Sequence, residues 1–148
     1  MIRDAGDVVD RYSIAELKVR RLGTPESHAE RAMFRAGVEE LVLAHPHLNW
    51  ANMVLDMIYI NGRIWDLESA VRAGELDGDL TEVGRRAIAI RKVNAERVAM
   101  KNMINMFLGQ GVQDVKQDHT STGVGGNCIT IEEFRTRYVL QGRGGACK

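Results

Sequence analysis

Three polar residues, Asn94, Arg97 and Lys101, interrupt an apolar stripe that helical spacing predicts between residues 83 and 108. Two of them are cations, and a cation held against an apolar core is strongly unfavourable unless it meets an anion. The sequence therefore predicts that Arg97 and Lys101 pair with an anion. That anion is either a protein carboxylate such as Glu68 or a bound phosphate.

The preceding helical segment carries a second stripe, which starts apolar at Val54 and becomes polar. Its later members follow at helical spacing and are Asn61, Trp65, Glu68 and Arg72. If the two segments are antiparallel neighbours, these side chains face Arg97 and Lys101. Amide, aromatic, carboxylate and cationic groups gathered in this way are typical of a site for an anionic ligand with a flat ring. Arg72 would then bind phosphate with the other cations, and Trp65 would stack on the ring.

A purely structural interpretation of the same residues stays open. A network of ion pairs would fix the register of the helices or line a subunit interface without any ligand. On the first helical segment, Asp10 and Glu16 do not share a helical face, so they are a poor metal pair with each other. Either could serve a site completed by other helices, although a plain amphipathic helix explains the segment more simply.

Helical periodicity and helix-breaking residues divide the chain into the elements that must position these groups. The expected main helices cover residues 7–22, 25–44, 50–73 and 79–108, and a short helix covers 130–140. Thr24, Asp79 and Thr130 are expected to cap helix starts, and Gly23 and Gly74 to end helices. The sequence therefore predicts an all-α fold, a helical bundle of four main helices with a C-terminal arm.

We expect one domain, with the bundle over residues 1–108 and the arm and short helix over 109–148. Residues 109–126 have neither helical nor strand periodicity, and loops of this length are usually functional or mobile. We expect this arm to cross onto a neighbouring subunit or to close over the polar stripe. Its far end would be anchored by Ile131, Phe134 and Tyr138.

The composition excludes several classes of protein. The 148 residues contain 20 Lys and Arg against 20 Asp and Glu, which argues against nucleic-acid binding by bulk positive charge. No apolar run is long enough to span a membrane. Cys128 and Cys147 form neither a disulfide framework nor a CxxC motif, so a cytoplasmic location is expected. The wide apolar arc of residues 50–73 predicts a homo-oligomer, most simply a two-fold dimer.

Parts of the two longest segments resemble an uncharacterised bacterial helical family, a domain of unknown function often encoded beside glycan-building enzymes. The matching residues are Trp65-Asp66-Leu67-Glu68 with Arg72, then Arg91-Lys92-Val93-Asn94-Ala95-Glu96-Arg97 and Ile104-Asn105. This resemblance implies no particular activity. It supports the same candidate site residues.

The chain is also similar to the MazG-type all-α nucleoside triphosphate pyrophosphohydrolases. Glu39-Glu40-Leu41 resembles their first acidic motif and residues 55–59 the end of the second, whereas Lys92, Asn94 and Arg97 resemble the phosphate-binding helix. The similarity implies a metal-dependent hydrolase acting on a nucleotide or another phosphorylated small molecule.

In that family Mg²⁺ or Mn²⁺ is held by acidic residues. The similarity implies metal binding by Glu40 and Asp56. Glu68 lies outside the family's motifs and is expected to complete the metal site, and Glu40 and Glu68 are expected to be catalytic. Met53 stands where the second motif has Glu, and no acid follows Glu40 by three residues. The alternative to this enzyme is a non-catalytic helical oligomer or interaction protein whose polar stripe is structural.

Overall fold

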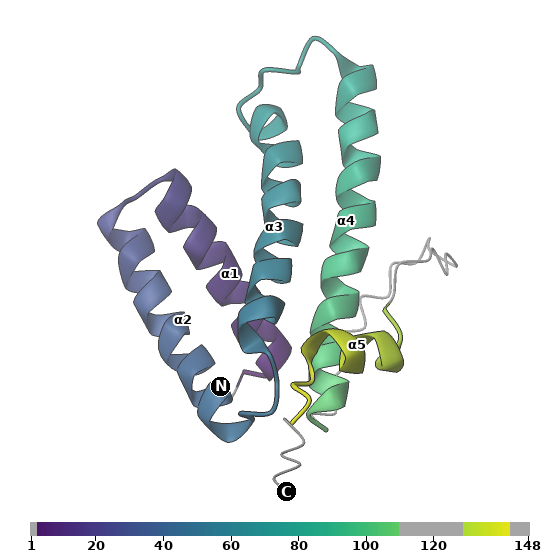
Figure 1. Ribbon diagram of the computed structural model, residues 1–148. Helices are drawn as coiled ribbons and strands as arrows, with labels where there is room; N and C mark the ends of the chain where they lie inside the picture. The colour runs from purple at the N-terminus through teal and green to yellow at the C-terminus, as the bar shows by residue number, and fades with distance from the viewer. Residues whose placement is uncertain (1–2, 110–128, 143–148) are drawn as a thin grey trace, which may run out of the picture.

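The computed structural model describes residues 3–109 and 129–142 (Figure 1). Its helices are α1 (Ala5–Arg21), α2 (Pro25–Ala44), α3 (Trp50–Arg72), α4 (Leu80–Phe107) and α5 (Ile131–Tyr138). The described residues thus form an all-α fold with four main helices and a short C-terminal helix, which confirms the predicted fold class. Most of residues 109–126, the predicted arm, lies outside the described residues.

Local signals in the sequence set the helix ends. The Thr24 hydroxyl accepts the Ser27 N–H at 3.2 Å, and the Asp79 carboxylate accepts the Glu82 N–H at 3.0 Å. Thr130 and Glu133 form the reciprocal capping box at the start of α5. Helix α1 begins two residues earlier than expected, because Asp4 caps it by accepting the Asp7 N–H at 2.7 Å.

Helix α1 lies between α2 and the antiparallel pair formed by α3 and α4 (Figure 1). It contacts all three of the other long helices. The N-terminal half of α4 and the C-terminal half of α3 extend beyond α1 and α2 as a two-helix projection (Figure 1). The two longest helices are therefore antiparallel neighbours, which was the condition for the predicted ligand site.

The core lies where α1, α3, α4 and α5 meet. Its fully buried large side chains include Val9, Met53, Met57, Ile104 and Phe134. Met53 and Met57 belong to the wide apolar arc from which the sequence analysis predicted a homo-oligomer. Within a single chain, α1 and α4 pack against α3 and bury these two methionines.

Helix α5 crosses the ends of α3 and α4 near the base of the bundle (Figure 1). Phe134 and Tyr138 are buried there as expected, whereas Ile131 is exposed and anchors little. The chain after α5 also pairs with the α2–α3 connection, because Leu48 and Val139 form an isolated antiparallel bridge. The C-terminal helix therefore belongs to the same packed unit as the main helices.

Candidate functional site

A group of polar side chains lies inside the bundle, between α1, α3 and α4. We call it the α1–α4 polar cluster, and its members are Asp7, Asp10, Ser13, Asn61, Arg97, Lys101 and Asn105. Asp10 is only 3% exposed, so its charge must be compensated from within the protein. The cluster brings together three of the predicted ligand-binding residues, Asn61, Arg97 and Lys101.

Asn61 is the centre of the hydrogen bonds in this cluster. Its side-chain amide donates to Asp10 Oδ1 at 2.9 Å and to Ser13 Oγ at 2.7 Å. The Ser13 hydroxyl in turn donates to the Asp10 backbone carbonyl at 2.6 Å. Asp10 and Ser13 are three residues apart on α1, so the helix places both on the face that meets α3.

The two cations of α4 find their anions on α1. Arg97 Nε lies 3.5 Å from Asp10 Oδ1, and Lys101 Nζ lies 3.6 Å from Asp7 Oδ1. The sequence analysis correctly expected anionic partners, but it named Glu68 or a phosphate. The signal that could have identified these partners is the spacing of Asp7 and Asp10, which puts two carboxylates on the packed side of α1.

The remaining predicted ligand-binding residues lie away from this cluster. Glu68 forms an ion pair with Arg72 at 2.8 Å, one turn along α3. Trp65 lies beneath the guanidinium of Arg21, whose carbon is 5.5 Å from the ring centroid. Asn94 is half-buried on α4. The structure therefore brings together only part of the predicted constellation.

The predicted metal ligands do not converge. Asp56 and Glu68 stand twelve residues apart on α3, which places them about 18 Å apart along the helix axis. Glu40 is exposed on α2. Among residues 3–109 and 129–142, no group of three or more His, Cys, Asp or Glu side chains could hold a metal ion.

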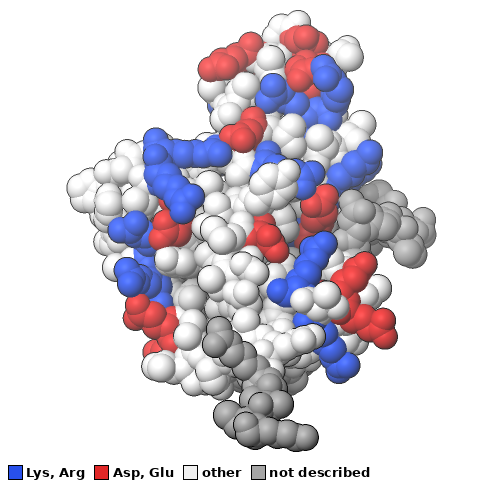
Figure 2. Space-filling model, in the orientation of Figure 1, with Lys and Arg blue, Asp and Glu red and all other residues white. Residues whose placement is uncertain are grey.

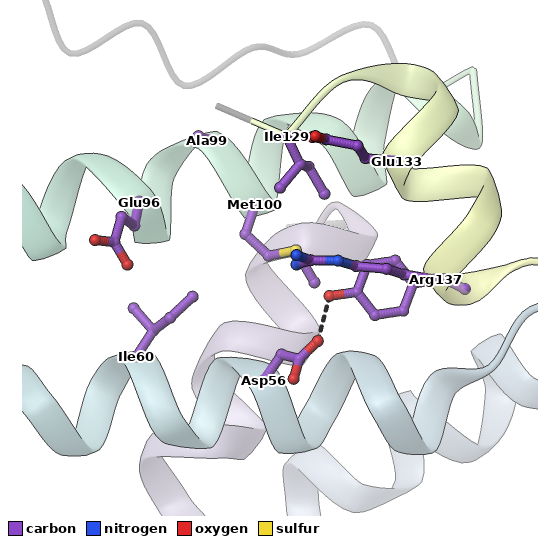
Figure 3. Close-up of a pocket in the computed structure, with 9 residues that line it drawn as sticks. Asp56, Ile60, Glu96, Ala99, Met100, Ile129, Glu133 and Arg137 are labelled. Carbon is purple, nitrogen blue, oxygen red and sulfur yellow. Dashed lines mark hydrogen bonds between the residues drawn. The ribbon is translucent and has the colours of Figure 1, made fainter. Parts of the chain in front are cut away.

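A pocket of about 350 Å³ opens between α3, α4 and α5 (Figure 3). Its lining combines apolar side chains with three carboxylates, one guanidinium and one phenol. The lining residues are Asp56, Ile60, Glu96, Ala99, Met100, Ile129, Glu133, Arg137 and Tyr138. Sequence reasoning missed this pocket because it depends on where α5 docks, which no local pattern specifies.

The carboxylates of this pocket already have partners. The Tyr138 hydroxyl donates to Asp56, and Arg63 binds Glu96 at 2.8 Å. Glu133 accepts the Thr130 N–H at 2.9 Å as part of the helix cap. Burial and the adjacent Asp56 carboxylate raise the pKa of Tyr138 well above its usual value, so this phenol stays neutral. All three carboxylates that line the pocket are therefore paired within the described part of the chain.

Charges of both signs are interspersed on the face of the molecule in Figure 2, and neither sign forms a continuous field there. None of the described helices is long and apolar enough to cross a membrane. Comparisons with protein-family models, curated proteins and solved structures gave no match. Fold and site together define the class of the described residues, an all-α helical bundle with an internal polar cluster.

Proposed function

We propose that this chain is a non-catalytic helical interaction protein whose interrupted stripe is structural. The observation that carries this proposal is the pairing of Arg97 with Asp10 and of Lys101 with Asp7. Both cations of the stripe are neutralised by carboxylates of α1, so they stabilise the packing of the first helix against the fourth. The cytoplasmic location expected from the cysteines is part of the proposal.

Electrostatics favour this role over phosphate binding. A phosphate placed against Arg97 and Lys101 would also approach the carboxylates of Asp10 and Asp7. Asp10 is buried, so little solvent screens that repulsion. The side chains that were predicted to complete a ligand site, Trp65 and Arg72, have their own partners on the surface of α1 and α3.

A second candidate function is binding of a phosphorylated small molecule, including hydrolysis of the MazG type with Mg²⁺ or Mn²⁺. One observation favours it. Arg97 Nε is buried and has no hydrogen-bond partner among the described residues, because its 3.5 Å distance to Asp10 is that of an ion pair only. An anion reaching the half-buried guanidinium would give this group an additional acceptor.

Thermal unfolding separates the two candidates. The wild-type chain is heated with and without nucleoside triphosphates and Mg²⁺ or Mn²⁺, and Arg97→Ala is heated beside it. A structural cluster predicts no stabilisation by any nucleotide and a loss of about 3 kcal/mol in Arg97→Ala, because Asp10 is left buried without its cation.

Arg85→Ala is the matched control, since Arg85 is an exposed arginine of the same helix and, among the residues that the structure describes, pairs with Glu82 alone. It should change stability by less than about 0.5 kcal/mol. Nucleotide stabilisation of the wild type that disappears in a stably folded Arg97→Ala would overturn the structural role and establish phosphate binding.

A further inference from the structure

Asn61 and Gly62 form the only Asn-Gly pair in the 148 residues of the sequence. An asparagine loses its amide most readily when glycine follows it, because no side chain then crowds the next backbone nitrogen. The other asparagines precede residues that carry side chains. The sequence therefore concentrates this chemistry at Asn61, the centre of the α1–α4 polar cluster.

The reaction requires no reagent other than water. The Gly62 nitrogen loses its proton and bonds to Asn61 Cγ, while the Cγ–Nδ2 bond breaks and the amide takes up a proton and leaves as ammonia. Water then opens the resulting succinimide ring at one of its two carbonyls. Opening at the side-chain carbonyl gives aspartate. Opening at the backbone carbonyl gives isoaspartate, in which the main chain passes through the former side chain.

The folded protein blocks both partners of this reaction. Asn61 is 5% exposed, and its side-chain amide donates to Asp10 Oδ1 at 2.9 Å and to Ser13 Oγ at 2.7 Å. Gly62 lies within α3, where helical geometry commits its N–H to the carbonyl of Ile58. The nitrogen therefore keeps its proton, and the side chain is held away from it, as long as α1 and α3 stay packed.

Packing does not explain why residue 62 is glycine. A Cβ there would lie 3.6 Å from Arg21 Nη2 and 3.7 Å from Leu17 Cδ2, which are ordinary contact distances. Gly62 is helical and is not among the glycines with positive φ. Glycine within a helix is also less favourable than alanine. The chain thus carries a helix-weakening residue at the position that makes the buried asparagine reactive.

Neither product of the reaction can replace Asn61. An aspartate would set a second carboxylate against Asp10, which is only 3% exposed, and its charged form has no hydrogen to donate. An isoaspartate would lengthen the main chain by one carbon and interrupt the hydrogen bonds of α3. A chain that is deamidated while unfolded therefore cannot regain the native packing of α1 against α3.

We propose that Asn61-Gly62 is a modification site that reacts in the unfolded chain, is protected in the folded protein, and makes prolonged unfolding irreversible. The proposal is independent of the proposed function. It holds equally for an interaction protein and for a protein that binds a phosphorylated ligand.

Incubation of the full chain at mildly alkaline pH, in guanidinium chloride and in native buffer, tests the proposal. Peptide mass spectrometry follows the conversion of amide to acid at each asparagine. Asn61 should convert at least about 100-fold more slowly in native buffer, because the reaction must then wait for unfolding. In guanidinium chloride it should convert faster than Asn49 and Asn94.

Samples taken from guanidinium chloride at intervals are diluted into native buffer, and circular dichroism measures the fraction that refolds. This fraction should fall in step with the conversion of Asn61. Gly62→Ala is the matched control, because it keeps Asn61 but places a side chain beside the attacking nitrogen. In guanidinium chloride its Asn61 should convert several-fold more slowly, and this comparison does not require the variant to fold.

Three results would overturn the proposal. Equal rates at Asn61 in native and unfolded wild type would show that the fold does not protect it. Equal rates in unfolded wild type and unfolded Gly62→Ala would show that the Asn-Gly pair is not the reactive unit. Converted chains that refold as completely as unconverted ones would show that deamidation does not make unfolding irreversible.

Discussion

Gly6 of α1 donates its backbone N–H to Asn105 Oδ1 of α4 at 2.8 Å, where the two helices cross in close contact. A Cβ at position 6 would lie 2.5 Å from the Lys101 carbonyl oxygen and 3.0 Å from Asn105 Oδ1. The absence of a side chain on Gly6 therefore sets the distance between α1 and α4. The Arg97–Asp10 and Lys101–Asp7 pairs depend on that distance.

Gly6→Ala should destabilise the protein by about 1–3 kcal/mol, because a backbone carbonyl cannot move aside cheaply. Urea unfolding monitored by circular dichroism measures the loss. Gly62→Ala is the control, since its Cβ would meet side chains only at ordinary contact distances of 3.6 and 3.7 Å. That variant should gain about 0.5–1 kcal/mol from helix propensity. Equal changes in the free energy of unfolding for Gly6→Ala and Gly62→Ala would contradict the close approach of α1 and α4 at Gly6.

Asn61→Asp should replace the donor at the centre of the polar cluster with a second carboxylate beside Asp10. We expect a loss of about 3 kcal/mol or more at neutral pH. The introduced carboxyl should have a raised pKa in the folded state, because only its protonated form can donate to Asp10. The folded protein then binds a proton more tightly than the unfolded chain, so stability should increase as the pH falls.

Chemical unfolding of Asn61→Asp at pH 7 and at about pH 5 measures whether its free energy of unfolding increases as the pH falls. Asn61→Ala is the control, because it loses the same hydrogen bonds without adding a titrating group. The difference in the free energy of unfolding between Asn61→Asp and Asn61→Ala should become smaller as the pH falls. If it stays constant, the carboxyl at position 61 is not close to Asp10.

Tyr138→Phe should remove the hydrogen bond to Asp56 at a cost of about 0.5–1.5 kcal/mol at neutral pH. The raised pKa of Tyr138 adds a pH dependence. Above about pH 10 an unfolded tyrosine loses its proton while Tyr138 keeps it, so the wild type loses stability as the pH rises. The difference in the free energy of unfolding between wild type and Tyr138→Phe, measured by urea unfolding, should become smaller as the pH rises over that range.

Phe134→Ala should cost about 3–5 kcal/mol, because Phe134 is fully buried between Phe107 and Tyr138. Ile131→Ala, one turn earlier on the same helix, should cost less than about 1 kcal/mol since Ile131 is exposed. Denaturant unfolding measures the loss of stability in each of these two variants. A small effect at Phe134 would mean that α5 does not belong to the cooperative core.

The helices could be predicted because their signals are local. Thr24, Asp79 and Thr130 cap helices through residues three positions away, and the glycines that end α1 and α3 adopt positive φ near +63° and +74°. Apolar spacing alone defined the packed side of α3. Neither kind of signal depends on how the helices are arranged in space.

The partners in the site could not be predicted in the same way. Arg97 and Lys101 revealed a need for anions, but many carboxylates could meet it, and only the packing of α1 against α4 selects Asp10 and Asp7. The pocket on α3 depends on Tyr138 reaching Asp56 across 82 residues of sequence. Such distant pairings follow from the assembled core rather than from any short pattern.

The pairing of Asp10 with Arg97 also sets the order in which the protein can mature on the ribosome. The first helix leaves the exit tunnel long before the fourth, and until α4 is made the Asp10 carboxylate has no cation to accompany it into the interior. Helices α1 and α2 can associate early, but the nascent chain cannot bury the polar side of α1 until α4 has also left the tunnel. Until then α1 remains open to chaperones and proteases.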